Sequence, residues 1–279
     1  MHIIHYKVTP CAYAPDAISD AINYYTPHTS EVVIHHKLLP GRADVVHFHN
    51  RCLPVDVPSL IQYHSEPHRV DLETAPDYKL VLAQYHATLP EYAACRRVRN
   101  VILFEHEPYV QRDVEGIRIG YSPSFRGSDG WFDKGYGRTK EILHRVCETV
   151  GGCSYDLVQN VPLDVCLERK SRCNILIDEC ATGSYHRCTL EALALGKLAV
   201  VHLSPEIDRV AREAAGTALP VVNVPLDGLE EMLVRICQNR DRVIDCGRRS
   251  RAWMLRHWHP RDLAAEYVGH YERVKAGTA

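Results

Sequence analysis

The chain has 279 residues, of which 46% are hydrophobic, 8% aromatic and 24% charged, a composition typical of globular rather than disordered proteins. Its 33 Lys and Arg residues nearly balance 35 Asp and Glu residues, and the net charge of −2 disfavours a protein that binds nucleic acid mainly through electrostatics. No apolar run reaches the ~20 residues needed to span a bilayer, and the N-terminus lacks the pattern of a secretory signal. We therefore expect a cytoplasmic protein without transmembrane contact, and a position at the membrane surface stays open.

In the first part of the chain, short apolar segments alternate with loops and one helix candidate. A helix is predicted over 16–25, and strands are predicted over 2–6, 31–36, 45–49, 59–63, 79–84 and 100–104. Strands that alternate with helices or loops in this way indicate a parallel, doubly wound α/β sheet.

A segment rich in proline and charge, 105–116, interrupts this alternation and predicts a domain boundary. Beyond it, strands are predicted over 117–121, 155–159, 174–177, 198–202 and 219–222, and helices over 137–150, 163–172, 185–195, 206–215, 226–238, 241–257 and 260–276. We therefore predict two Rossmann-like α/β domains that face a cleft, spanning 1–112 and 113–262, and a C-terminal helix within 263–279 that packs back on the first domain.

Cysteine and histidine are both abundant, with 11 and 17 residues. No two cysteines have the Cys-x2-Cys spacing of zinc or redox sites, and their odd number suits a disulfide scaffold poorly, so we expect reduced, packed thiols. The histidines form two local groups, 35–36 and 47–49. His47 and His49 point to one face of their predicted strand and could hold a metal, but the sequence shows no third ligand. Polar residues at a cleft are therefore the favoured interpretation.

The segment 178–201 reads as strand, glycine-containing loop, helix and second strand. Gly183 allows the backbone to approach a ligand closely, and Ser184 can cap the predicted helix. The start of that helix would offer backbone N–H groups and a positive dipole end, a suitable site for phosphate. Glu191 lies near the middle of the helix on a turn shared with Arg187, where its carboxylate could accept hydrogen bonds from two ribose hydroxyls.

This segment resembles the signature of nucleotide-sugar glycosyltransferases with the GT-B fold, especially the large retaining family 4. The chain keeps Leu-Glu-Ala-Leu-Ala-Leu-Gly-Lys at 190–197 and Ala-Val-Val at 199–201. Gly183 stands where the family has the first Glu of its paired-Glu motif, so we expect backbone N–H groups of 183–185 to take its place. The resemblance implies that the donor is bound here by Gly183, Ser184, Tyr185, His186, Arg187 and Glu191.

Two further segments are similar to the same family. Gly-Tyr-Ser-Pro-Ser at 120–124, followed by Lys134 and Gly135, resembles the loop whose basic residues neutralise the donor diphosphate. Lys134 is the candidate for this catalytic and donor-binding role, with Arg126 second, and Ser122 and Ser124 complete the predicted donor site.

The segment Val-Pro-Ser-Leu-Ile-Gln-Tyr-His at 57–64 is similar to a family strand that ends in a histidine close to the transferred sugar. His64 is therefore the second predicted catalytic residue. His47, His49 and His86 are predicted on the acceptor side.

Several motifs are missing. The chain has no Gly-x-Gly-x-x-Gly after the first strand, no phosphate-binding Gly-x4-Gly-Lys-Ser/Thr and no Gly-x-Ser-x-Gly. It also has no Asp-x-Asp, the motif with which A-type glycosyltransferases hold a divalent ion on the diphosphate. We therefore expect neither metal nor cofactor, with helix N–H groups and Lys134 stabilising the leaving group.

The predicted function is transfer of a sugar from a nucleotide-diphosphate sugar, with UDP-sugars as first donors to test, to an acceptor hydroxyl, with retention and without metal. The acceptor is a saccharide, a lipid-linked saccharide or a modified DNA base. One alternative is a phage-type enzyme that glycosylates hydroxymethylated DNA bases, which the basic stretch 240–261 permits and the net charge disfavours. Another is a non-catalytic nucleotide-sugar-binding protein, suggested by the missing first Glu.

Overall fold

The computed structural model describes residues 1–7, 13–34, 43–123 and 134–278. These form two compact units, the first made of residues 1–103 and 258–279 and the second of residues 104–257. The sequence placed 104–112 in the first domain, but these residues are bonded within the second unit. Arg187 Nη2 donates to the Tyr109 hydroxyl at 3.2 Å, and Lys197 Nζ donates to the Arg112 carbonyl at 2.8 Å.

The first unit contains a six-stranded parallel sheet in the order β2-β1-β3-β4-β5-β6. Its strands are β1 (His2–Lys7), β2 (Thr29–Ile34), β3 (Val45–His49), β4 (Ser59–Tyr63), β5 (Lys79–Leu82) and β6 (Arg96–Val98). Every residue of β3 is buried, as expected for a central strand of a parallel sheet. The chain passes from β1 to β2 on one side and back to β3 on the other, so the carboxyl ends of β1 and β3 flank the switch point of this sheet.

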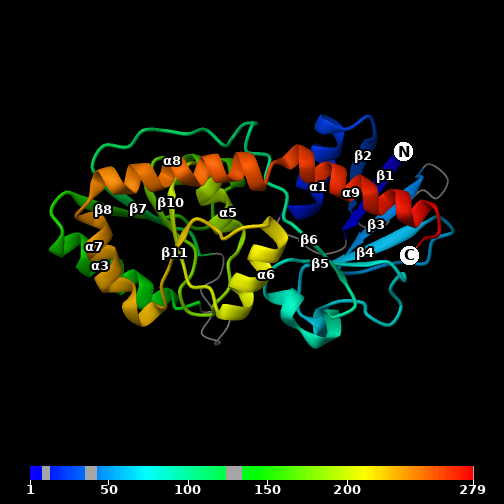
Figure 1. Cartoon of the computed structure of the whole chain (residues 1–279), viewed down its shortest axis with the longest axis horizontal. Coiled ribbons are helices and arrows are strands. Elements are labelled where there is room, and N and C mark those ends of the chain that lie inside the picture. The colour runs from blue at the N-terminus through cyan, green and yellow to red at the C-terminus, as the bar shows by residue number, and fades with distance from the viewer. Residues whose placement is uncertain (8–12, 35–42, 124–133, 279) are drawn as a thin grey trace. The chain divides into compact units, whose positions relative to one another are not determined.

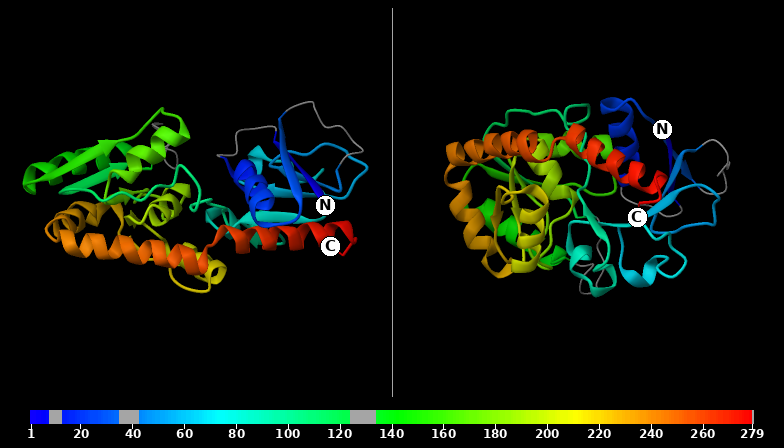
Figure 2. Two further views of the ribbon diagram at one scale, coloured as in Figure 1. Left: turned by 90° about the horizontal axis from the view of Figure 1, so that it is seen from above. Right: turned by 45° about the vertical axis from the view of Figure 1, so that its right-hand side comes forward.

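Two helices pack together on this unit, α1 (Ala14–Tyr25) and α9 (Pro260–Lys275). Figures 1 and 2 show α9, in red, beside α1 and over β3 and β4. The buried side chains of α9 include Leu263, Ala264, Tyr267 and Tyr271, whose three- and four-residue spacing forms one face of a helix. Helix α9 therefore covers a face of the sheet that would otherwise be open.

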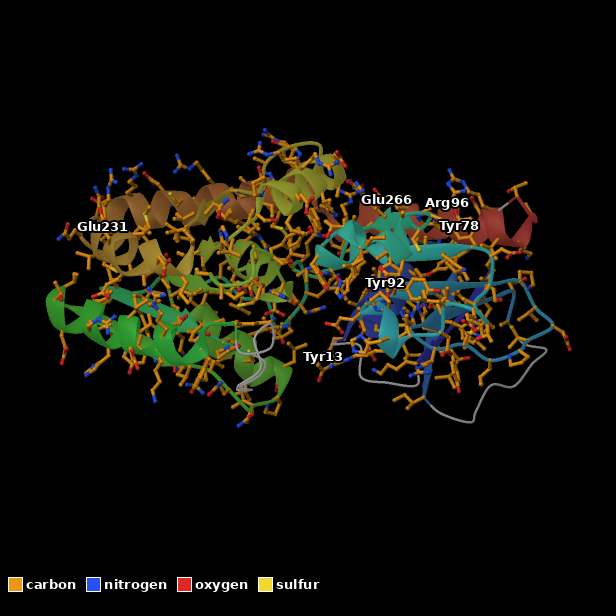
Figure 3. The ribbon with its side chains drawn as sticks, turned by 90° about the horizontal axis from the view of Figure 1, so that it is seen from below. Tyr13, Tyr78, Tyr92, Arg96, Glu231 and Glu266 are labelled. Carbon is orange, nitrogen blue, oxygen red and sulfur yellow. The ribbon has the colours of Figure 1, made fainter. Side chains whose placement is uncertain are left out.

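The predicted strand 100–104 is wrong, because the last strand of this sheet is β6, over Arg96–Val98. Val101, Ile102 and Phe104 are buried without pairing to the sheet, which explains why their apolar pattern resembles a strand. β6 itself has two exposed arginines, a feature of edge strands. The Arg96 guanidinium lies 5.0 Å from the ring centre of Tyr78. Both side chains are labelled in Figure 3.

The second unit contains a five-stranded parallel sheet in the order β11-β10-β9-β7-β8. Its strands are β7 (Ile117–Tyr121), β8 (Cys153–Leu157), β9 (Ile175–Ile177), β10 (Leu198–Val201) and β11 (Val221–Asn223). Its helices are α3 (Tyr136–Thr149), α4 (Leu163–Ser171), α5 (Arg187–Ala194), α6 (Pro205–Ala215), α7 (Leu229–Cys237) and α8 (Arg240–His257). The predicted α/β class with two parallel, doubly wound sheets is thus confirmed.

The strand order of the second sheet places its switch point between β7 and β9, because the chain leaves β7 toward β8 and then returns to β9 on the other side. Ligands of open α/β sheets bind in the crevice at the carboxyl ends of such strands. The residues that follow these two strands are Ser122 and Asp178, which belong to two of the segments singled out in the sequence. Within the described part of the chain, no helix combines the length and the apolar character needed to cross a bilayer.

Candidate functional site

Two carboxylates that follow β9 hold the glycine-containing loop and the start of α5. Asp178 accepts hydrogen bonds from the backbone N–H of His186 at 2.6 Å and of Thr189 at 3.2 Å. Glu179 accepts from the backbone N–H of Ala181, Thr182 and Ser184 at 2.8–3.2 Å. Both carboxylates are buried, and their bonds to backbone N–H groups fix the conformation of residues 178–189.

These bonds change the expected start of the helix. Helix α5 begins at Arg187, two residues later than predicted, and His186 occupies the N-cap position without a side-chain cap. Asp178 takes that role from the end of β9, while the Ser184 hydroxyl donates to the Tyr185 carbonyl at 3.3 Å. The N–H groups of His186 and Thr189 are therefore already bonded. A phosphate at this helix end has to use other donors.

The backbone conformation at position 183 is one that favours glycine. Its φ is +80°, a conformation that residues with a side chain rarely adopt, and its carbonyl accepts from the Ser204 N–H at 2.8 Å. A Cβ at this position would lie 3.1 Å from the Cβ of Ser204, the residue that caps α6. A glutamate here, as in the family 4 signature, would be strained in this backbone conformation, and its Cβ would press on Ser204.

Lys134 lies close to this loop. It adopts a left-handed conformation with φ of +47°, and Gly135 follows with φ of +68°. A Cβ on Gly135 would come within 3.3 Å of the Ala181 Cβ, so the two segments are in contact. Burial alone would raise the pKa of Asp178, but His186, Lys134 and the hydrogen bond from Thr189 outweigh it and lower the pKa. The structure therefore brings Lys134 to the loop that precedes α5.

Glu191 is buried between two cations. Its carboxylate accepts from Lys170 Nζ at 2.7 Å and from Arg187 Nε at 2.9 Å, and Glu191 and Lys170 are each only 3% exposed. Burial would raise the pKa of Glu191, but the charges of Lys170 and Arg187 lower it, so the group stays ionised. A carboxylate has about four acceptor positions, so two remain beyond these bonds. Sequence reasoning found Arg187 one turn away and missed Lys170, which comes from α4.

The remaining predicted donor residues are placed as follows. The Ser122 hydroxyl, just after β7, lies 3.5 Å from the Cys166 thiol of α4. Tyr185 is fully buried, and His186 Nδ1 lies 3.3 Å from the Asp178 carboxylate. Ser124 and Arg126 lie outside the described residues. The donor residues that are described thus gather around the ends of β7 and β9.

On the first unit, the structure joins three of the four predicted histidines. His49 Nδ1 lies 2.9 Å from His64 Nε2, and the His47 and His49 rings stack with centres 4.2 Å apart. His47 and His49 are completely buried, so neither side chain reaches an acceptor in this structure. His64 is half-buried, and burial lowers its pKa to about 3, with a further contribution from His86. Of this group, His64 remains the candidate for contact with substrate.

His86 lies apart from these bonds, in a short 3-10 helix over Tyr85–Thr88 that follows β5. It is half-buried, and its charge acts on His64. The sequence missed His5 altogether, because nothing in the isolated first strand indicates that its side chain meets His49. His35 and His36, the other local histidine pair, lie outside the described residues.

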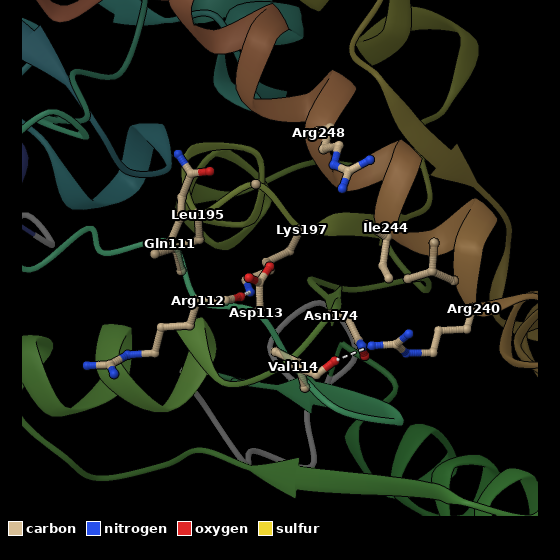
Figure 4. Close-up of a pocket in the computed structure, with 12 residues that line it drawn as sticks. Gln111, Arg112, Asp113, Val114, Asn174, Leu195, Lys197, Arg240, Ile244 and Arg248 are labelled. Atoms are coloured by element: carbon tan, nitrogen blue, oxygen red, sulfur yellow. Dashed lines mark hydrogen bonds between the residues drawn. The ribbon is translucent and has the colours of Figure 1, made fainter.

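The second unit also has a pocket of about 380 Å³ at the opposite end of its sheet. Asn174 and Lys197, which precede β9 and β10, line it together with Arg240, whose Nη2 donates to the Val114 carbonyl at 3.0 Å (Figure 4). Because these residues lie at the amino ends of the strands, the pocket is not part of the candidate site.

Lys197 in this pocket should make stability depend on pH. Burial lowers its pKa from 10.5 to about 8, so between these values the unfolded chain binds a proton that the folded chain does not. Stability rises with pH where the unfolded state binds more protons. The free energy of unfolding of the wild type, minus that of Lys197→Met, should therefore rise by roughly 3 kcal/mol from pH 8 to 10.5. Urea denaturation across this range measures it, and a constant difference would contradict it.

No protein-family model matches the sequence, and no curated protein matches it. Solved structures do match. A glycosyltransferase from Rickettsia africae superposes with a TM-score of 0.65 at 10% identity and 98% coverage of both chains. Sucrose-phosphate synthase from Thermosynechococcus elongatus gives 0.61 at 10% identity, over 99% of this chain and 100% of that chain. The Streptomyces glycosyltransferase SsfS6, solved with thymidine diphosphate, gives 0.51 at 12% identity, over 96% and 99%. The chain has the GT-B fold.

The GT-B fold confirms the resemblance drawn from 117–202 at the level of the fold. In this GT-B chain the second unit carries the contact between the 134–135 loop and the 178–187 loop, and the first carries the histidine group. This arrangement can bind an anionic ligand beside Lys134 and the positive end of α5.

Proposed function

We propose that this chain transfers a sugar from a nucleotide-diphosphate sugar to an acceptor hydroxyl in the cytoplasm. The observation that carries the proposal is the contact between the loop of Lys134 and the loop that leads into α5, at the switch point of the second sheet. These are the two segments that resemble the donor site of family 4. Structural neighbours solved with thymidine diphosphate or with UDP support a nucleotide diphosphate as the ligand.

The chemistry proposed for the donor site is electrostatic. As the glycosidic bond breaks, the leaving diphosphate gains negative charge, and the Lys134 ammonium group and the dipole of α5 would stabilise that charge. Glu191 would accept from the ribose hydroxyls with the acceptor positions left after Lys170 and Arg187. His64 would hydrogen-bond to the transferred sugar as a neutral imidazole, which its low pKa favours. Retention at the anomeric carbon is proposed on the family resemblance.

The direct test is turnover. The full chain is incubated with a panel of UDP-, TDP- and GDP-sugars, and release of the nucleoside diphosphate is measured with and without saccharide acceptors. Calorimetry with the same nucleotides measures binding. Binding with turnover supports the transferase, binding without any turnover supports the non-catalytic alternative, and neither binding nor turnover contradicts the proposed donor site.

In the structure, the basic stretch 240–261 no longer favours the DNA-modifying alternative. Arg240 and Arg251 donate to backbone carbonyls within the second unit, and Arg248 pairs with Asp245. Part of this positive charge is thus used inside the fold. This alternative would be supported again if the affinity for DNA fell steeply with salt concentration. The slope would have to correspond to several neutralised phosphates.

We expect transfer to need no metal on the diphosphate. Asp178 and Glu179, the carboxylates beside the loop, are bonded to backbone N–H groups and are poorly placed to hold a divalent ion. The transfer rate should therefore be equal in EDTA and in excess Mg²⁺. A loss of activity on chelation that Mg²⁺ or Mn²⁺ restores would contradict this expectation.

A further inference from the structure

Three buried histidines from neighbouring strands meet inside the first unit. His5 of β1 pairs in register with His47 of β3, and His49 lies two residues further on the same face. All three side chains have no exposed surface, and one ring nitrogen of each lies within 4.8 Å of the others. Side chains of the kind that bind metals form no other such group of three in residues 1–7, 13–34, 43–123 and 134–278.

The hydrogen bonds of these rings leave one nitrogen, Nε2 of His5, clearly without a partner in the described part of the chain. His5 Nδ1 lies 3.0 Å from His49 Nε2, His49 Nδ1 lies 2.9 Å from His64 Nε2, and His47 Nδ1 lies 2.9 Å from the Tyr271 hydroxyl. His5 Nε2 is buried and has no partner among the described residues, whereas the His47 ring also interacts with the Gln62 side chain, which would have to give way to an ion. Since buried polar atoms are nearly always bonded, the unpartnered nitrogen of His5 points to a missing ligand.

We propose that His5, His47 and His49 bind a divalent transition-metal ion, with Zn²⁺ as the best fit. An all-imidazole ligand set suits Zn²⁺, and three histidines with an open fourth position is an arrangement that Zn²⁺ adopts. His47 and His49 would bind through Nε2 and His5 through a ring nitrogen. The hydrogen bond between His5 and His49 would be replaced by bonds to the metal.

Two of the rings already have a hydrogen-bond partner for their second nitrogen, although they stack and would have to turn to face one ion. A histidine ligand usually uses its second ring nitrogen in a hydrogen bond that fixes its orientation. His49 has such a bond to His64, and His47 has one to Tyr271 of α9.

The proposed ligands all belong to the first unit, and one of them, His49, is bonded to His64, the residue proposed to contact the transferred sugar. An ion there would join β1 to β3 and, through Tyr271, hold α9 on the sheet. Its role is therefore to stabilise the first unit. Since binding to the folded state alone stabilises it by mass action, the melting temperature should rise with Zn²⁺.

The experiment uses the full chain without a polyhistidine tag. After chelation and exchange into metal-free buffer, one equivalent of Zn²⁺ is added, and bound zinc is measured after gel filtration. X-ray absorption then identifies the ligands, because nitrogen at about 2.0–2.1 Å is distinguishable from sulfur at about 2.3 Å. We expect one zinc per chain, bound by nitrogen only, and a higher melting temperature. No retained zinc would overturn the proposal.

Sulfur in the zinc shell would overturn it as well. The Sγ atoms of Cys147 and Cys153 lie 3.5 Å apart, and Cys237 Sγ is 3.9 Å from Cys153, so these thiols of the second unit are the main competitors for zinc. The variant Cys153→Ser should leave zinc binding unchanged if the histidines hold the ion.

Two variants test the histidine site directly. His47→Gln should weaken zinc binding by about 100-fold or more, and Tyr271→Phe, which keeps its ring in place, by about 10-fold or more. His144→Gln on the exposed side of α3 is the control and should bind as the wild type does. If His47→Gln does not fold, Tyr271→Phe decides, and unchanged affinity in that variant would refute the assignment.

Discussion

Replacing Glu191 with alanine is expected to lower the free energy of unfolding by about 3–5 kcal/mol, because it leaves a buried ammonium group without its counter-charge. Lys170 donates to Glu191 at 2.7 Å with both side chains buried, and Arg187 loses the same partner. Urea denaturation followed by circular dichroism measures the loss. Glu230→Ala, which removes an exposed ion pair with Arg145, is the control and should change the free energy of unfolding much less. A loss of less than 1 kcal/mol in Glu191→Ala would contradict the buried pair.

The double variant Lys170→Met with Glu191→Leu separates stability from ligand binding. Replacing a buried ion pair by apolar residues of similar size is often neutral or stabilising, so this variant should recover the part of the lost stability that is due to Lys170, while Arg187 keeps only its bond to Tyr109 among the described residues. If Glu191 also binds the ribose, nucleotide affinity in the folded double variant should still fall tenfold or more, since a hydrogen bond to a charged acceptor contributes about 1.5–3 kcal/mol. Calorimetry with the nucleotide that binds best measures it. Affinity equal to the wild type would show that Glu191 serves only the fold.

Removing the charge of Lys134 should slow transfer by about 100-fold while weakening donor binding much less, because its charge acts on the developing negative charge of the leaving group. Lys134→Ala keeps a residue with a Cβ at this left-handed position, so the backbone strain is unchanged. The turnover number is measured from nucleotide release at saturating donor, and the affinity by calorimetry. Lys134→Arg should restore part of the rate because it keeps the positive charge.

The matched control for this variant is Lys140→Ala, which removes an exposed lysine of the neighbouring helix α3. It should turn over as the wild type does. Normal turnover in Lys134→Ala, or equal losses of turnover in the two variants, would show that the diphosphate does not lie beside Lys134. The resemblance to family 4 would then describe the fold alone.

Sequence patterns were sufficient for features that depend on neighbouring residues. Alternation of short apolar runs with helices determined the α/β class and the parallel sheets, because buried parallel strands are apolar on both faces. The period of two residues in a strand placed His47 and His49 on one face. The positive φ of Gly183 follows from a loop between strand and helix that only glycine fits easily. The strand predicted at 100–104 failed because buried, unpaired apolar residues have the same pattern as a strand.

Tertiary structure alone decided which polar groups meet. Lys170 and Glu191 lie 21 residues apart, and His5 and His49 lie 44 apart, so no local spacing relates them. Asp178 caps α5 across the loop 179–186, a role that the sequence assigned to Ser184 because only local caps have a recognisable pattern. Pairings of this kind depend on strand order and on which helix covers which face. Those arrangements result from burial of the whole sheet, so they cannot be predicted from the sequence of a single segment.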